Sequence, residues 1–398
     1  MIITIQPSKL NGIIPAVPSK SHAHRLLICA AFSDQPTEII CTRTCKDIEA
    51  TVTCLRAIGA QILRSDNGYT VIPVDAIPPK ACLHCGESGS TLRFLLPIVG
   101  ALGIDAEFCL EGSLPGRPIT QLLREMEKHG CKVSMPCADK ILCSGRLRPG
   151  AYTISGSETS QFATGLLLAM SLMDGNSHLS IQVSMESRPY ISLTQNVLRC
   201  FGVDTSGFFV HGSYPLRSPC RLTAEGDWSN GAFFLASAHL GNTVTVSGLN
   251  PSSIQGDRII VEALQTLVHA PIIDIADIPD LFPILAVTAG ALHGATFINI
   301  SRLRLKESDR VASVVAMLEN LGATVCISSN SLTISSAAYH GCTIDSCSDH
   351  RIAMSAAIAA TVASGPVTIL GAECVAKSYP SFWEDYRSLG GNYEQYLW

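Results

Sequence analysis

The densest group of charged residues in the chain lies at residues 302–310, R-L-R-L-K-E-S-D-R. Only 15% of the 398 residues are charged, yet this segment contains Arg302, Arg304, Lys306, Glu307, Asp309 and Arg310. A solvated surface does not need two acids among four bases, whereas an enzyme that binds an anion and moves protons uses both signs. A predicted strand (Ala295–Ile300) precedes the segment and a predicted amphipathic helix (Val311–Leu321) follows it, so regular structure would hold it in place.

The composition indicates a globular chain long enough for two domains, with 47% hydrophobic residues and no biased tract. The formal net charge of −5 and the pI near 6.1 argue against a nucleic-acid-binding surface, which would be basic. Any anion site must therefore come from local clustering of bases. Small-molecule partners are expected, and no nucleic acid.

The sequence predicts a cytoplasmic, monomeric protein with no membrane partner. The longest apolar runs, Phe162–Met173 and Ile352–Ser364, are too short to span a bilayer, and the start M-I-I-T-I-Q is typical of a strand rather than a signal peptide. Sixteen cysteines without a signal peptide indicate free thiols. Cys82 and Cys85 form the one C-x-x-C pair, and no second pair completes a zinc ribbon. We therefore favour small buried side chains over a metal or redox role.

A two-helix pattern repeats along the chain, each time opening with a small polar cluster before an apolar helix. The clusters are Ser19–Ser21, Glu87–Thr91, Ser157–Ser160, Asp227–Asn230, Pro279–Asp280 and Ser348–His350. Anchors at Ser21, Ser90, Thr159, Ser229, Asp280 and Asp349 are separated by 69, 69, 70, 51 and 69 residues. In most copies the second helix ends at a glycine before a strand, but the copy near Val261–His269 lacks that glycine. Regular spacing of this size predicts six α/β repeats.

Six repeats divide naturally into two domains of three. The predicted first domain is residues 13–224, and residues 1–12 with 225–398 form the second, with the middle boundary near Leu222–Gly226. The first predicted strand, Ile2–Gln6, precedes the first anchor, so it can belong to the C-terminal repeats and make the chain cross between domains twice. The active site is expected in the cleft between the domains.

The polar clusters have two interpretations. Ser, Thr and Asp are common N-caps, which explains any one cluster. Basic residues nevertheless recur beside the openings, and helix N-termini bind anions. These bases are Lys20, Arg25, Arg93, Arg117, Arg188, Arg310, Arg351 and Lys377. Together they favour an anion-selective site.

Acids near the openings are fewer. Asp280 precedes an apolar run and fits either an N-cap or a general base. Glu307 lies between Lys306 and Arg310, whose charges should keep it ionised. Asp309 and Asp349 are interpreted as N-caps or as partners that orient an arginine. The chain has no P-loop, dinucleotide fingerprint or nucleophilic serine elbow.

Nine ordered motifs resemble the 5-enolpyruvylshikimate-3-phosphate synthases, the 3-phosphoshikimate 1-carboxyvinyltransferases of the enolpyruvyl transferase family. They span about residues 6–385. The motifs are P-S-K-S-H-A-H-R (18–25), G-E-S-G-S-T-L-R (86–93), G-R-P-I (116–119), S-E-T-S-Q-F (157–162), S-R-P-Y (187–190), I-P-D (278–280), R-L-K-E-S-D-R (304–310), S-D-H-R-I-A-M (348–354) and A-K-S-Y-P (376–380).

The resemblance implies transfer of the enolpyruvyl group of phosphoenolpyruvate to the 5-hydroxyl of shikimate 3-phosphate, with release of phosphate. This is a transferase step of the shikimate pathway, which leads to chorismate and the aromatic amino acids. It needs no cofactor and no metal. The implied fold is an inside-out α/β barrel, two similar domains each of three βαβαββ units.

The resemblance also assigns residues to the two substrates. Those matched to shikimate 3-phosphate are Lys20, Ser21, Arg25, Thr159, Ser160, Gln161, Ser187, Asp280 and Lys306. Those matched to phosphoenolpyruvate are Lys20, Gly89, Arg117, Gln161, Arg310, Arg351 and Lys377. Asp280 is the candidate base and Glu307 the candidate proton shuttle, with Lys20 as an alternative acid. Arg302 stands where many relatives have Asn, and Thr159 where Ser is usual.

The residues argue against two other functions. The sister carboxyvinyltransferase that acts on UDP-N-acetylglucosamine usually carries a cysteine in the loop that corresponds to Glu111–Pro118, and this chain has none there. A non-catalytic phospholigand- or RNA-binding repeat protein would need a basic face, which the acidic pI opposes.

Overall fold

The chain folds into two compact units. A computed structural model describes residues 1–183, 185–212 and 215–396. One unit, here called the inserted unit, comprises Pro18–Ala224, and the other, the terminal unit, comprises Met1–Val17 with Glu225–Trp398. Residues 397 and 398, with which the predicted second domain ends, lie outside the described residues.

The inserted unit alternates helices and strands throughout. Its helices are α1 (Lys20–Ala31), α2 (Lys46–Ala57), α3 (Gly89–Leu102), α4 (Thr120–Lys128), α5 (Ser160–Met170) and α6 (Arg188–Cys200), with short 3-10 helices η1 (Leu114–Gly116) and η2 (Ser206–Phe208). Its strands are β3 (Thr37–Ile40), β4 (Gln61–Ser65), β5 (Gly68–Ile72), β6 (Lys80–Gly86), β7 (Asp105–Leu110), β8 (Cys131–Cys137), β9 (Lys140–Gly145), β10 (Ala151–Ser155), β11 (Ser177–Gln182), β12 (Phe209–Val210) and β13 (Arg221–Thr223).

The terminal unit has the same alternation. Its helices are α7 (Trp228–His239), α8 (Ile260–Thr266), α9 (Phe282–Ala291), α10 (Arg310–Asn320), α11 (His350–Ala360) and α12 (Phe382–Ser388), with 3-10 helices η3 (Gly256–Ile259), η4 (Leu267–His269), η5 (Ser301–Leu305) and η6 (Ala372–Lys377). Its strands are β1 (Ile2–Gln6), β2 (Asn11–Pro15), β14 (Thr243–Ser247), β15 (Ile272–Asp274), β16 (Ala295–Ile298), β17 (Val325–Ile327), β18 (Ser331–Ile334), β19 (Cys342–Asp345), β20 (Val367–Leu370) and β21 (Asn392–Tyr396).

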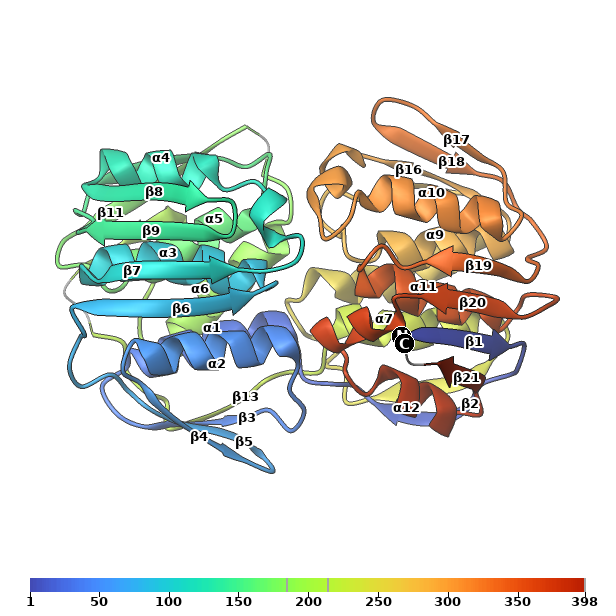
Figure 1. The fold of residues 1–398 in the computed structure, drawn as a ribbon, viewed down its shortest axis with the longest axis horizontal. Coiled ribbons are helices and arrows are strands. Elements are labelled where there is room, and N and C mark those ends of the chain that lie inside the picture. The colour runs from blue at the N-terminus through green and yellow to red at the C-terminus, as the bar shows by residue number, and fades with distance from the viewer. Residues whose placement is uncertain (184, 213–214, 397–398) are drawn as a thin grey trace. The chain divides into compact units, whose positions relative to one another are not determined.

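The strands of the described residues form six sheets, three in each unit, as the six predicted repeats require. The inserted unit contains the sheets β13-β3-β5-β4, β6-β7-β9-β8 and β10-β11-β12. The terminal unit contains β14-β2, β15-β16-β18-β17 and β19-β20-β1-β21. In the sheets β6-β7-β9-β8 and β15-β16-β18-β17, two parallel strands are followed along the chain by an antiparallel hairpin, which is the predicted βαβαββ order (Figure 1). In β13-β3-β5-β4 the parallel partner of β3 is β13, which comes last along the chain.

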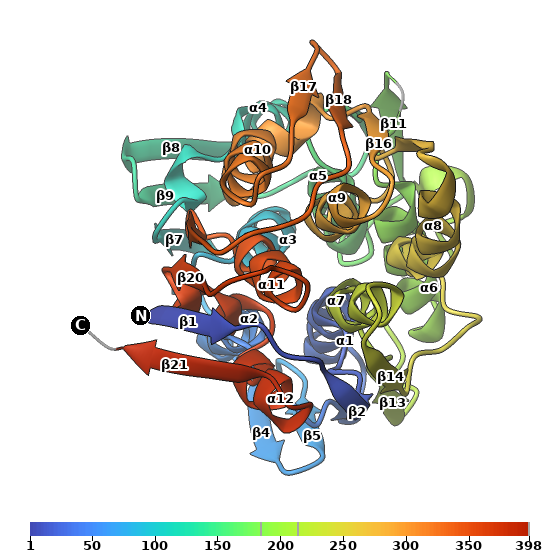
Figure 2. The ribbon, with the colours of Figure 1, turned by 90° about the vertical axis from the view of Figure 1, so that its right-hand side faces the viewer.

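Helices fill the inside of each unit and the sheets cover it. Almost every residue of α3, α5, α9 and α11 is buried, as expected for helices surrounded on all sides. In Figure 2, α7, α9 and α11 lie together in the middle of the terminal unit, where all three pairs are in contact. Each unit has its own hydrophobic core. The fold is therefore the inside-out α/β arrangement.

Three strands complete sheets far from them in sequence, and one of them is β13, which pairs in parallel with β3. Strand β1 pairs antiparallel with β20 and β21, so the chain passes between the units twice. Strand β2 pairs in parallel with β14, from Asn11 opposite Thr243 to Pro15 opposite Ser247. The predicted boundary at residue 13 is therefore too early, because this pairing keeps residues 13–17 in the terminal unit.

The fourth repeat is shorter because it lacks the hairpin. After α8 the chain runs through η4 directly into β15, the first strand of the next sheet, which accounts for the spacing of 51 residues. The helix still ends in a left-handed residue, although the glycine is missing. Ala270 takes this conformation, with φ of 48°.

Five of the six polar clusters provide the N-cap of a central helix. The capping side chains of α1, α3, α5, α7 and α11 are those of Ser19, Ser88, Thr159, Asp227 and Asp349, each accepting a bond from a backbone N–H. The exception is α9, whose N-cap is Leu281 and has no capping side chain. Asp280 is thus not an N-cap.

All sixteen cysteines have free thiols, but only some are buried as predicted. The buried ones are Cys29, Cys41, Cys45, Cys54, Cys85, Cys131 and Cys143, whereas Cys82 is among the exposed ones. Among the described residues, no helix combines the length and the apolar character needed to cross a lipid bilayer.

Candidate active site

Each predicted site residue follows the carboxyl end of a strand that has a parallel neighbour. Such ends meet at one edge of a sheet, where helix N-termini and ligands gather. In the inserted unit, Gly89 follows β6; Arg117 follows β7; Thr159, Ser160 and Gln161 follow β10; and Ser187 follows β11. Lys20, Ser21 and Arg25 also lie in the inserted unit, but the strand before them, β2, belongs to the terminal unit. In the terminal unit, Asp280 follows β15; Lys306, Glu307 and Arg310 follow β16; Arg351 follows β19; and Lys377 follows β20.

Two arginines converge on the N-terminus of α3 in the inserted unit. A Cβ atom at Gly89 would lie 2.9 Å from Nη1 of Arg117 and would also collide with Nη1 of Arg93. Arg93 donates to Oε1 of Gln161 at 3.1 Å, and Nε2 of Gln161 donates to Oγ of Ser90 at 3.1 Å. Two guanidinium groups, an amide and a helix N-terminus therefore surround one point, an arrangement suited to a phosphate or carboxylate. We call Gly89, Arg93, Arg117 and Gln161 the Gly89 cluster.

Arg25 is a buried cation without an acidic partner among the described residues. Its Nε donates to Oγ1 of Thr194 at 2.8 Å, and its Nη groups donate to Oγ1 of Thr164 and to the carbonyls of Ser21 and Tyr190. Burial lowers the pKa of Arg25 to about 10. Neutral partners position the guanidinium without cancelling its charge, so a substrate carboxylate would supply the missing anion.

The starts of α5 and α6 lie at one sheet edge because β10 and β11 are parallel and in register. Oγ1 of Thr159 accepts from the backbone N–H of Gln161 at 3.2 Å, and Ser160 is the first residue of α5. Ser187 precedes α6 in the left-handed region, at φ 58° and ψ 38°. A serine held in this strained conformation at a helix start is consistent with a functional constraint.

Lys20 is paired with a residue that the sequence did not suggest. Its Nζ lies 2.8 Å from Oδ2 of Asp47, in the first turn of α2. Beside them a chain of hydrogen bonds joins three helices, from Nδ1 of His24 to Thr51 and from Thr51 to Thr91, each at 2.7 Å. Burial lowers the pKa of His24 to about 3, so the ring is neutral. The helix starts that present Lys20 and Gly89 are thereby tied together.

In the terminal unit, Arg310 is fully buried and bound to three carboxylates. Nη1 lies 2.9 Å from Oδ1 of Asp280, Nη2 lies 2.7 Å from Oε2 of Glu307, and Nε lies 3.0 Å from Oδ2 of Asp349. A further bond from Nη1 reaches the carbonyl of Pro279. Its donors are thus occupied within the protein, and an incoming anion would have to compete with one of these acids, of which Glu307 and Asp280 are partly exposed and Asp349 is not.

Asp280 lies between two arginines. Its Oδ2 lies 3.2 Å from Nη2 of Arg351, opposite its bond to Arg310. Burial opposes ionisation, but Arg351, Lys306 and Arg310 outweigh it and hold the pKa of Asp280 well below its usual range. The carboxylate is therefore ionised, as a base must be.

Lys306 has a pKa lowered to about 7. Burial is the main cause, Arg302 and Arg310 add to it, and Asp280 opposes it. Arg302, which stands where many relatives have Asn, is itself buried. Its positive charge helps to lower the pKa of Lys306.

Lys377, at the end of η6, is also buried.

The other two acids of this region act as caps and as arginine partners. Asp309 caps α10 by accepting from the N–H of Ala312 at 3.0 Å, and it pairs with Arg304 at 3.0 Å. Asp349 caps α11 by accepting from the N–H of Arg351 at 3.0 Å, in addition to its bond with Arg310. Both interpretations from the sequence are confirmed for each residue.

Comparison with known proteins shows the family. The sequence model of EPSP synthase (3-phosphoshikimate 1-carboxyvinyltransferase) matches residues 5–272 and 266–386. The chain is 37% identical to the 3-phosphoshikimate 1-carboxyvinyltransferase of Clostridium kluyveri, over 99% of this chain and 98% of that protein. The chain belongs to the EPSP synthase family. The protein of that name from Clostridium beijerinckii is 33% identical, over 99% of this chain and 98% of that protein.

Solved EPSP synthases share the fold. The enzyme from Acinetobacter baumannii superposes with a TM-score of 0.80 over 99% of both chains, at 23% sequence identity. A second structure of EPSP synthase from the same organism also gives a TM-score of 0.80, at 22% identity and over the whole of both chains. Both agree with the two-unit, six-sheet arrangement described above.

Two residues near the site, Asp47 and Asp257, were not among the predicted site residues. Arg93 was predicted only as one of the bases beside the helix openings, without a substrate, and it donates to Gln161 beside Gly89. Asp47, which pairs with Lys20, lay in an ordinary acidic first helical turn and gave no signal. Asp257 is buried and accepts a bond from Ser229; its signal was an isolated acid in the shortened fourth repeat. Burial and repulsion from Asp280 raise the pKa of Asp257 to about 7.

The Gly89 cluster allows a prediction for the EPSP synthase reaction. In Gly89→Ala, the new Cβ would push the Arg93 and Arg117 side chains aside. Losing one charged hydrogen bond to the anion costs about 1.5–3 kcal/mol, or roughly 10–150-fold in affinity. We expect the KM for phosphoenolpyruvate to rise by about this factor, with little change in the KM for shikimate 3-phosphate.

Gly116→Ala is the matched control, because a Cβ there meets no atom within 4 Å. Steady-state kinetics with each substrate varied in turn would compare the two variants. An unchanged KM for phosphoenolpyruvate in Gly89→Ala would show that this cluster does not bind it.

Proposed function

We propose that the chain is a 3-phosphoshikimate 1-carboxyvinyltransferase of the shikimate pathway. It transfers the enolpyruvyl group of phosphoenolpyruvate to the 5-hydroxyl of shikimate 3-phosphate and releases phosphate. The observation that carries the proposal is the joint contact of Asp280 and Glu307 with Arg310, two acids in one cationic cluster. Full-length identity to enzymes of that name supports it.

Binding in this proposal relies on local positive charge. Arg25 receives the shikimate carboxylate, and Thr159, Ser160 and Ser187 receive the 3-phosphate. Arg117 and the N-terminus of α3 receive phosphoenolpyruvate. Gln161 lies beside the residues proposed for the 3-phosphate and beside those proposed for phosphoenolpyruvate. Arg310, Arg351 and Lys377 of the terminal unit act on the same substrates. Holding two reactants in a fixed orientation supplies much of the rate enhancement in such a reaction.

The reaction has an addition stage with two proton transfers and an elimination stage in which one proton leaves carbon. In the addition stage, the 5-hydroxyl loses a proton as its oxygen bonds to C2 of phosphoenolpyruvate, while C3 gains a proton and becomes a methyl group. In elimination, the methyl group loses a proton as the C2–O bond to phosphate breaks. Asp280, ionised and bound to Arg351 and Arg310, is the proposed base.

Glu307 is the proposed shuttle for the proton at C3. When a substrate anion competes for Arg310, the bond to Glu307 is the one that opens in this proposal, because Asp349 is fully buried and Asp280, although partly exposed, is also bound to Arg351. A carboxylate released from its arginine and placed beside a phosphate gains proton affinity. Lys20 is the alternative acid, and its ion pair with Asp47 holds it in place.

The pH dependence of the kinetics tests whether the charge of Lys306 is needed for substrate binding. Its pKa is about 7 in the unliganded protein, and only the protonated amine carries the charge that attracts anionic substrates. We expect kcat/KM to fall about tenfold per pH unit above pH 7, since it reports on free enzyme. Bound phosphates stabilise the ammonium, so the corresponding fall in kcat should begin at higher pH.

Lys306→Arg should remove the basic limb, because guanidinium stays charged across the range. Asp257 also titrates near pH 7, so Asp257→Asn is measured in parallel. A limb that persists in Lys306→Arg and vanishes in Asp257→Asn would assign the titration to Asp257.

The test of the function is release of phosphate from phosphoenolpyruvate. It should depend on shikimate 3-phosphate and not occur with UDP-N-acetylglucosamine. Release with the nucleotide sugar alone would favour the sister carboxyvinyltransferase. RNA binding that weakens with added salt, without any phosphate release, would favour a non-catalytic repeat protein.

We also propose that the enzyme is a cytoplasmic monomer without cofactor. Its sixteen free cysteines suit a reducing compartment. Light scattering after size exclusion should give a mass near 42.4 kDa. A mass of twice this value would refute the monomer.

A further inference from the structure

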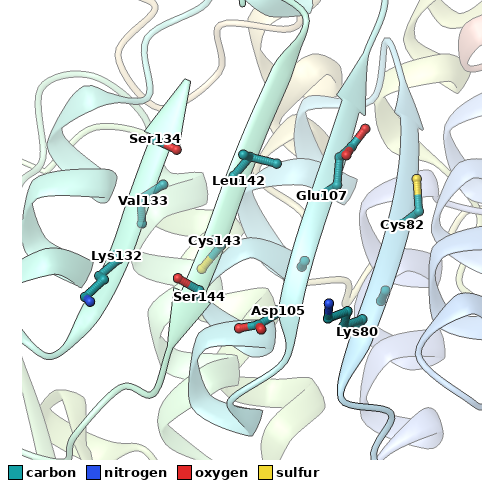
Figure 3. Close-up of a pocket in the computed structure, with 12 residues that line it drawn as sticks. Lys80, Cys82, Asp105, Glu107, Lys132, Val133, Ser134, Leu142, Cys143 and Ser144 are labelled. Atoms are coloured by element: carbon teal, nitrogen blue, oxygen red, sulfur yellow. The ribbon is translucent and has the colours of Figure 1, made fainter. Parts of the chain in front are cut away.

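Two thiols and an imidazole meet on the outer face of the sheet β6-β7-β9-β8. Sγ of Cys82 lies 3.6 Å from Nε2 of His84 and 4.0 Å from Sγ of Cys109. The three atoms all lie within 4.8 Å of one another, and no other group of three or more Cys, His, Asp or Glu in the described chain comes together in this way. Figure 3 shows Cys82 and Glu107 of this face on adjacent strands.

The register of the parallel strands brings the three side chains together. Cys82 lies opposite Glu107 and His84 opposite Cys109. Side chains two residues apart on a strand share a face, so all four project from the same side. Leu83 and Cys85 of the same strand are buried on the opposite side.

Two of the three distances between ligand atoms are close to those of a zinc site, and the third, between His84 and Cys109, is within 4.8 Å. With Zn–S bonds of about 2.3 Å and a Zn–N bond of about 2.0 Å, tetrahedral coordination places two sulfurs about 3.8 Å apart and sulfur and nitrogen about 3.5 Å apart. The observed 4.0 Å and 3.6 Å lie close to these values. Thiolate and imidazole are also the ligands that zinc prefers.

We propose that Cys82, His84 and Cys109 form a zinc site with an open fourth position. Both thiols lose their protons to solvent as Zn²⁺ binds, and the two thiolates balance the charge of the cation. His84 coordinates through Nε2, the atom that lies beside Sγ of Cys82. No oxidant or reductant is needed, and the site is separate from the proposed catalytic residues.

The surroundings leave the fourth position to water. Oε1 of Glu107 lies 3.8 Å from Sγ of Cys109 and is bound by Nζ of Lys140 at 2.6 Å. The carboxylate is therefore held beside the cluster rather than within it, where it can accept a bond from a zinc-bound water. A hollow of about 640 Å³ on the same face, lined in part by Cys82 and Glu107, has room for that water.

The cysteine pair that is visible in the sequence is not the pair that comes together in the structure. Cys82 and Cys85 form a C-x-x-C pattern, but residues three apart on a strand face opposite sides. The ligands within β6 are spaced C-x-H, and the third ligand lies 25 residues after His84, on the neighbouring strand. The sequence predicts no metal site, so this proposal departs from that prediction.

The test is a zinc titration of the full-length, reduced protein against a chromophoric chelator. One Zn²⁺ per chain should bind, and Cys82→Ser, His84→Asn and Cys109→Ser should each weaken binding by about 100-fold or more, since each removes one of three ligands. Zinc at 100 times the wild-type Kd should raise the Tm of the wild type by roughly 3 °C or more and that of the variants by about 1 °C or less. Cys137→Ser, which removes an exposed thiol on the same sheet, should behave like the wild type.

Alkylation followed by mass spectrometry separates the site from a disulfide. Zinc should protect Cys82 and Cys109 from alkylation, and a chelator should restore their reaction. Zinc binding that survives all three substitutions, binding at less than one equivalent, or loss of two hydrogens through a Cys82–Cys109 disulfide in the purified protein would each overturn the proposal.

Discussion

Glu307→Gln is expected to lower kcat by about 10²–10⁴-fold, the range that proton transfer by a positioned side chain contributes. Glutamine keeps the size of the side chain, and its amide oxygen can still accept the bond from Arg310, which is 2.7 Å in the wild type. It cannot exchange a proton at neutral pH. Binding of shikimate 3-phosphate should therefore stay close to that of the wild type, measured by calorimetry beside single-turnover kinetics.

Asp309→Asn is the control for this substitution. Asp309 lies two residues away, faces solvent and caps α10, and asparagine is an equally good N-cap. Its kcat should change little. Equal turnover in Glu307→Gln and the wild type would exclude the shuttle, and loss of substrate binding would instead make Glu307 a positioning residue.

Arg310→Met is expected to lower the stability of the protein by about 3–5 kcal/mol, the cost of removing one partner from a buried ion pair. The guanidinium is completely buried, and so is the carboxylate of Asp349. Without Arg310 this carboxylate keeps its cap bond but loses its counter-ion. Urea unfolding should show a lower midpoint, and activity should be lost because Asp280 and Glu307 no longer share a partner.

Arg304→Met tests whether any arginine of this segment would have the same effect. Arg304 pairs with Asp309 at 3.0 Å, but both side chains are 42% exposed. Exposed pairs contribute at most about 1 kcal/mol, so the midpoint should barely move. Equal effects of the two substitutions would show that burial of the Arg310 cluster contributes nothing to stability.

The repeat architecture could be predicted from the sequence because its signals are local. Small polar caps open five of the central helices, and their spacing counts the repeats. The fourth repeat shows where such signals stop: its short spacing was visible, but the missing hairpin was not. The boundary at residue 13 was wrong because pairing of β2 with β14 is a contact between segments more than 200 residues apart.

The sequence alone determined the family, the alternation of helices and strands, and which residue types gather at the helix openings, since motifs and caps depend on near neighbours. Only the tertiary structure decided which charges meet. Asp280 turned out to be an arginine partner and not a cap, Lys20 is held by Asp47, and the pKa of Lys306 is about 7. These outcomes depend on burial and on distances of a few ångströms between separate segments, because the strength of a charge interaction is set by its surroundings. The register of β6 with β7, which places Cys82 beside Cys109, is likewise a contact between separate segments.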